Sequence, residues 1–153
     1  QLGKYSLEKF TIKDNYRINS DAPIGINLCY ERSATAVVKF EPIGQDVLFI
    51  KQLQGVRRSQ YDSKQKCQIK ISSRGLSGLD WRRLLIDQVA EVARECNYTT
   101  LIVQSGHHNR WINVLYENQT VHLPLELALQ KYDAVAERLG FTQREDRNWY
   151  RQV

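Results

Sequence analysis

The residues that point most clearly to a function are nine Lys and Arg side chains between Lys51 and Arg83. Only two Asp residues lie in the same segment. The difference gives this segment a charge of +7, against +5 for the whole chain. The segment ends at Ser77-Gly78-Leu79-Asp80-Trp81, where the pattern predicts the start of a helix. Helix N-termini attract anions through unpaired N–H groups and the helix dipole. We therefore expect a phosphate-bearing small molecule here. The alternative is a solvated basic face that promotes solubility.

A second candidate is His107, which together with His108 follows an apolar run at residues 99–103. Ligands gather at the C-terminal ends of strands in α/β sheets, and His titrates near neutral pH. His107 or His108 is therefore a candidate general base, and His107 is the first choice. The alternative is a polar loop in which Trp111 packs on the core.

The three cysteines, Cys29, Cys67 and Cys96, are odd in number and widely spaced. Their spacing is not that of a zinc site, so we expect no metal. Reduced thiols favour a cytoplasmic protein. Cys96 falls on the apolar stripe of a predicted helix, so we expect it to be buried.

The basic segment also supports a nucleic-acid hypothesis, because Tyr61 and Trp81 lie among its charges and the sequence pI is about 9.2. No helix-turn-helix or zinc-finger motif accompanies it, so this alternative rests on charge alone.

A single domain of mixed α/β structure, residues 1–153, must position these groups. No apolar run reaches the roughly 20 residues that span a bilayer, so we expect no membrane association. The sequence leaves the oligomeric state open.

Alternating or apolar runs predict strands, and turn residues separate them. The predicted strands are residues 5–13, 24–30, 34–40, 47–53, 67–71 and 99–103, with hairpins over 111–121 and 141–152.

Two amphipathic helices are predicted from periodicity. The first begins near Trp81, with Ser77 and Asp80 resembling a capping box, and stops at Asn97. The second begins with Pro124 as its first residue and ends at Gly140, with Phe141 folding back. A helix between the strands at residues 47–53 and 99–103 predicts that these strands are parallel.

The order of these elements resembles the GCN5-related N-acetyltransferase family over residues 47–153. The resemblance is carried by Trp81-Arg82-Arg83-Leu84-Leu85, by Leu101-Ile102-Val103 and by Ala136-Glu137-Arg138-Leu139-Gly140-Phe141. It implies a mixed sheet of the α+β kind. Only about ten residues separate the first two predicted strands, so the N-terminal helical region of that family is reduced here.

The resemblance implies that acetyl-CoA or another acyl-CoA is the cofactor. In the family, a loop of pattern Arg/Gln-x-x-Gly-x-Gly/Ala holds the pyrophosphate. Here Arg74-Gly75-Leu76-Ser77-Gly78-Leu79 has the Arg, but its glycines are displaced. The implied cofactor-binding residues are Gln52, Leu53, Arg74, Ser77, Gly78, Arg82 and Arg83.

The family uses a Tyr of its fourth helix as general acid, and Ala136 stands at that position. Tyr132, one turn earlier, becomes the candidate, although a core Tyr is the alternative. The resemblance thus implies acyl transfer to an unknown amine, with Tyr132 and His107 as proton-transfer residues. The alternatives are a catalytically inactive binding domain of the same fold and a basic nucleic-acid-binding module.

Overall fold

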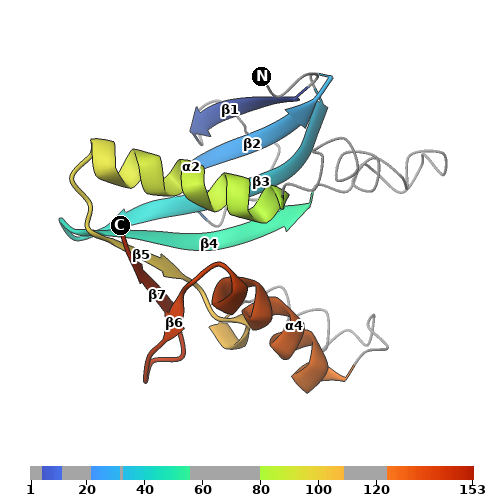
Figure 1. The fold of residues 1–153 in the computed structure, drawn as a ribbon, viewed down its shortest axis with the longest axis vertical. Helices are drawn as coiled ribbons and strands as arrows, with labels where there is room; N and C mark the ends of the chain where they lie inside the picture. Colours follow the sequence, from blue (N-terminus) through green and yellow to red (C-terminus); the bar gives the residue numbers. More distant parts are fainter. Residues whose placement is uncertain (1–4, 12–21, 32, 56–79, 109–123) are drawn as a thin grey trace. The chain divides into compact units, whose positions relative to one another are not determined.

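The computed structural model describes residues 5–11, 22–31, 33–55, 80–108 and 124–153 (Figure 1). The chain forms two compact units. The first contains residues 1–41 and 52–92, and the second contains 42–51 and 93–153. The strand predicted at 67–71 and the hairpin predicted at 111–121 lie outside the described residues.

The strands form a mixed sheet of seven, which confirms the predicted α+β class. Their hydrogen-bonded order is β1 (Tyr5–Thr11), β2 (Ile24–Tyr30), β3 (Ser33–Ile43), β4 (Val47–Gly55), β5 (Thr100–Val103), β7 (Trp149–Gln152) and β6 (Thr142–Gln143). The pairs β1–β2, β2–β3, β5–β7 and β6–β7 are antiparallel, whereas β4–β5 is parallel.

The core of the first unit lies on its antiparallel strands. These are β1 (Tyr5–Thr11), β2 (Ile24–Tyr30) and β3 (Ser33–Ile43). Residues 25–29 of β2 are all buried, so both faces of this strand are covered. In the view of Figure 1, helix α2 (Trp81–Glu95) passes in front of β2 and β3. Its buried stripe consists of Trp81, Leu85, Ile86, Val89, Ala90 and Ala93.

The start of α2 corrects the predicted cap. The carbonyl of Asp80 accepts the first helical bond from Leu84 N, and Oδ1 of Asp80 accepts a bond from Arg82 N at 3.0 Å. Asp80 is therefore the N-cap itself, in place of Ser77. The expected burial of Cys96 is wrong as well: the helix ends at Glu95, and the thiol is exposed. Asn97, with φ of 62°, ends the helix as predicted.

The second unit contains the predicted parallel pair. Strand β4 (Val47–Gly55) pairs with β5 (Thr100–Val103) from Val47↔Thr100 to Ile50↔Val103. The main chain of Gln104 adds one more bond, to Ile50 O at 2.9 Å.

Helix α4 (Leu125–Arg138) ends as the sequence predicts. Gly140 has φ of 83°, its N–H donates to Glu137 O, and Phe141 N donates to Ala136 O. This pair of bonds is a Schellman motif, and it turns Phe141 into the core. Pro124 occupies the N-cap rather than the predicted first helical position. The predicted closing hairpin is confirmed as β6 (Thr142–Gln143) and β7 (Trp149–Gln152).

Candidate functional site

The predicted cofactor-binding residues that the structure describes belong to the first unit. Gln52 and Leu53 are on β4, and Arg82 and Arg83 are in the first turn of α2. In the view of Figure 1, the last residues of β4 and the first turn of α2 lie at the same end of this unit. Three further predicted residues lie outside the described residues: Arg74, Ser77 and Gly78.

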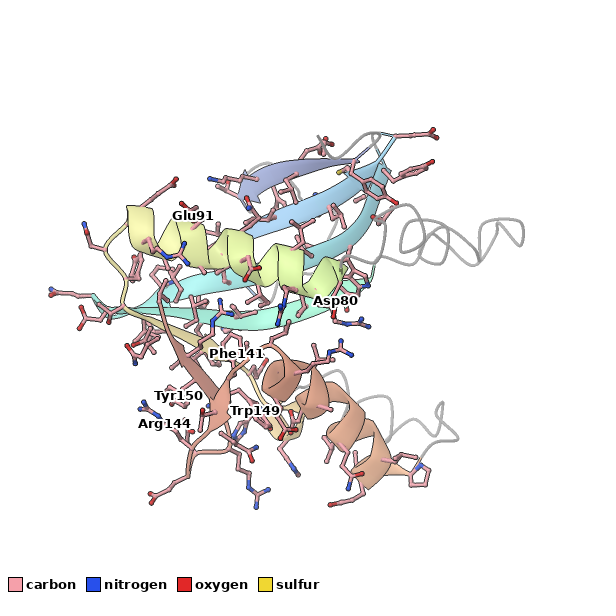
Figure 2. The ribbon with its side chains drawn as sticks, viewed as in Figure 1. Asp80, Glu91, Phe141, Arg144, Trp149 and Tyr150 are labelled. Carbon is pink, nitrogen blue, oxygen red and sulfur yellow. The ribbon has the colours of Figure 1, made fainter. Side chains whose placement is uncertain are left out.

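Arg82 is held at the helix start by contacts on two sides. Its guanidinium lies over the Trp81 ring at 4.3 Å from the ring centroid, and Nη1 is 3.9 Å from Asp80 Oδ1. Arg83 beside it is exposed. Stacking on an aromatic face limits the conformations of an Arg side chain. Together these cations can face a phosphate, even though the Asp80 carboxylate, labelled in Figure 2, offsets part of their charge.

Gln52 carries the clearest sign of a binding function. Only 8% of the residue is exposed, and its Oε1 atom is buried without a hydrogen-bond donor among the described residues. A buried carbonyl that accepts no bond destabilises the folded state by about 1–3 kcal/mol. Leu48 and Ile50, which alternate with it along β4, are apolar and buried. A ligand that donates a hydrogen bond to Oε1 would explain why a polar residue occupies this buried, otherwise apolar face of β4.

In the second unit, Asp133 connects α4 to the segment that follows β5. Its Oδ1 accepts a bond from Gly106 N at 2.8 Å, and Oδ2 accepts one from Ser105 Oγ at 3.3 Å. Ser105 is fully buried, and its N–H donates to Asn148 Oδ1 at 3.2 Å. A Cβ on Gly106 would lie 3.0 Å from a methyl of Leu129, so glycine permits this close approach. Sequence reasoning missed Asp133, because nothing local distinguishes it from the other acids of α4.

An open pocket of about 380 Å³ lies beside this connection. It is lined by His107, Glu126, Leu129, Gln130, Asp133, Ala134, Glu137, Gln143 and Trp149. The predicted base His107 is exposed there, within η3 (Gly106–His108). Its Nδ1 atom lies 3.4 Å from Nη1 of Arg147. Trp149 and the carboxylates of this pocket were not predicted as site residues.

The turn between β6 and β7 is organised by Asp146. Its Oδ2 accepts bonds from Tyr150 Oη at 2.7 Å and from Asn148 Nδ2 at 3.0 Å. The bond from Tyr150, followed by those from Asn148, lowers the pKa of Asp146 below its ordinary value of 3.8. The same bond raises the pKa of Tyr150 above 10.0. Arg144 lies over the Tyr150 ring at 4.2 Å, and Figure 2 shows both on the side of the hairpin away from α4.

Replacing Tyr150 with Phe should raise the pKa of Asp146 toward 3.8, because the principal hydrogen bond to the carboxylate is lost. A depressed carboxyl pKa stabilises the folded state above the ordinary value, and this contribution disappears as pH falls through the folded pKa. The turn should therefore loosen only below about pH 4. Carboxyl NMR titration of the wild type and the variant measures the shift. An unchanged Asp146 pKa would refute the bond.

Comparisons with known proteins identify the fold. The structure matches Ard1 from Thermoplasma volcanium, an N-acetyltransferase, with a TM-score of 0.51 and 10% identity over 98% of each chain. The chain has a GCN5-related N-acetyltransferase-like fold. An acetyltransferase from Streptococcus agalactiae 2603 matches with a TM-score of 0.47 and 9% identity, over 98% of this chain and 99% of that one.

N-acetylglutamate synthase from Neisseria gonorrhoeae, solved with coenzyme A and N-acetyl-glutamate, matches with a TM-score of 0.40 and 16% identity. That match covers 84% of this chain and 25% of the other. No protein-family model and no curated sequence matches the chain.

The catalytic candidate on α4, Tyr132, stays a prediction. Ala136, at the family's Tyr position, is buried and offers no proton. The backbone of Tyr132 belongs to α4, but its side chain lies outside the described residues.

Over the described ranges, no three His, Cys, Asp or Glu side chains form a metal-binding group. None of the helices in that part of the chain is long and apolar enough to cross a membrane.

Proposed function

We propose that this chain binds acetyl-CoA or another acyl-CoA and transfers the acyl group to an amine. The observation that carries the proposal is the buried, unpartnered Oε1 of Gln52, in a chain whose fold is acetyltransferase-like. The pantetheine arm of coenzyme A contains amide N–H groups, which are the kind of donor that this oxygen lacks.

The phosphates are assigned to the start of α2. Arg82 and Arg83 supply charge there, and the segment that precedes them is strongly basic. Helix N-termini bind phosphate through backbone N–H groups and the dipole. Arg74, Ser77 and Gly78 complete the proposed phosphate site.

Acyl-CoA supplies an acyl group activated as a thioester. The chain must then remove a proton from the attacking amine and return one to the departing thiolate. We assign the first transfer to His107 and the second to Tyr132, whose hydroxyl is a suitable acid for a sulfur anion.

The test is a calorimetric titration with acetyl-CoA and with CoA at moderate salt. Wild type should bind both saturably. Arg82→Gln should weaken binding about tenfold, because a charge-assisted hydrogen bond contributes about 1.5–3 kcal/mol. The matched control is Arg94→Gln, an exposed Arg in the last turn of the same helix, which should leave affinity unchanged.

Equal affinity of the two variants would remove the phosphate assignment. Absence of heat and of thermal shift with wild type would overturn acyl-CoA binding. The two remaining hypotheses would then be an inactive interaction domain and a nucleic-acid-binding module, which salt-sensitive retardation of an oligonucleotide would test.

A further inference from the structure

One face of α4 forms the long wall of the pocket described above, which we call the α4 groove. Glu126, Gln130, Asp133 and Glu137 follow one another along this face. At 1.5 Å of rise per residue, Glu126 and Glu137 are separated by about 16 Å along the helix axis. The groove is therefore elongated. Leu129 and Trp149 give it an apolar wall.

The groove is acidic, although the chain as a whole carries +5. Among the lining residues that the structure describes, three are acids and none is Lys or Arg. Asp133 is engaged by Gly106 and Ser105. The carboxylates of Glu126 and Glu137 are exposed, and neither forms a hydrogen bond or ion pair with another described residue. Two exposed carboxylates at opposite ends, without a cationic partner in the described part of the chain, favour a ligand with two separated cationic groups.

Trp149 adds a second, independent observation. It is 9% exposed, and its Nε1 atom is buried and donates to no acceptor in the described part of the chain. Figure 2 shows it on the side of the hairpin toward α4. An indole N–H only donates, so a simple cation cannot satisfy it. The ligand must also offer an acceptor, such as a carbonyl oxygen.

We propose that the α4 groove binds a short, extended, basic peptide segment. An extended chain advances about 3.3 Å per residue, so the first and fifth residues of a five-residue segment lie about 13 Å apart, and the length of Lys and Arg side chains covers the remaining distance between Glu126 and Glu137. Side chains at the first and fifth positions point to the same side and can both be Lys or Arg. A main-chain carbonyl oxygen of the segment accepts the bond from Trp149 Nε1. Peptide binding in this groove requires no acyl-CoA, although His107, which also lines the groove, is assigned above to proton transfer.

The test uses a fluorescein-labelled, end-blocked peptide, Lys-Ala-Ser-Ala-Lys, titrated with the full chain at low salt without acyl-CoA. Fluorescence anisotropy should report saturable binding. Glu126→Gln and Glu137→Gln should each weaken it about threefold, as expected for exposed ion pairs. The matched control is Glu145→Gln, an exposed acid on the β6–β7 turn outside the groove. It should have no effect.

A second variant separates peptide recognition from charge alone. Trp149→Phe keeps an aromatic wall and removes the N–H, so affinity should fall about fivefold. Circular dichroism checks that this variant is folded. No binding by wild type, or equal binding of Glu-Ala-Ser-Ala-Glu, would overturn the proposal. So would retention of full affinity by folded Trp149→Phe, because the groove would then recognise cations only. None of these outcomes affects acyl-CoA binding.

Discussion

Replacing Asp133 with Ala should lower the free energy of unfolding by about 2 kcal/mol. The variant leaves the N–H of Gly106 and the hydroxyl of Ser105 without their acceptor. Both residues are buried, so water cannot fully replace the carboxylate. The effect is large because one side chain of α4 accepts two hydrogen bonds from buried groups of the segment that follows β5.

Urea denaturation followed by circular dichroism measures this change, and two variants control it. Asp133→Asn keeps one acceptor oxygen for Gly106 N and should lose about half as much. Glu137→Ala, exposed on the same helix, should stay within about 0.5 kcal/mol of wild type. If Asp133→Ala and Glu137→Ala were equally stable, the contacts of Asp133 would contribute nothing to folding.

The parts of the fold that were predictable depend on neighbouring residues. The C-terminus of α4 is an example, because Leu139, Gly140 and Phe141 determine a Schellman motif by themselves. The parallel pairing of β4 and β5 followed from a helix between two apolar runs, since such crossovers have few solutions. Asn97 likewise adopts the left-handed conformation that its side chain tolerates.

The parts that were not predictable depend on residues far apart in the sequence. Asp133 meets Ser105 across 28 positions, and no local pattern announces that contact. Cys96 continues the apolar period of α2, yet the helix ends before it and the thiol is exposed. Trp149 looks like any core aromatic, and only the structure reveals that its N–H has no acceptor in the described residues.

The candidate site also has features that the sequence predicted and features that only the structure shows. The family resemblance predicted Gln52 only as one of several cofactor-binding residues. The structure distinguishes it from the others, because its Oε1 atom is buried and has no hydrogen-bond partner among the described residues. Arg82 was named for its charge, and the structure adds its contacts with Trp81 and Asp80. The charge of the candidate residues and the order of the helices and strands could thus be predicted from the sequence. Which buried polar atoms lack a hydrogen-bond partner could not.

Replacing Gln52 with Met should raise the free energy of unfolding by about 1 kcal/mol, while affinity for acetyl-CoA should fall about tenfold. Met has nearly the volume of Gln, so the site stays filled, and a buried oxygen without a donor is removed. Chemical denaturation without ligand measures the first change, and calorimetric titration measures the second. Gln54→Met, at an exposed position of the same strand, should alter neither quantity.

These opposite signs distinguish a ligand-binding oxygen from a structural one. If Oε1 supported the fold, its removal would destabilise the chain, and any loss of affinity would follow from that. If the oxygen is kept for a ligand, the folded state without ligand is relieved of an unsatisfied group, and only the complex is weakened. A Gln52→Met chain that is less stable than wild type would exclude the second interpretation. A more stable chain that has lost acetyl-CoA would establish Gln52 as part of the cofactor site.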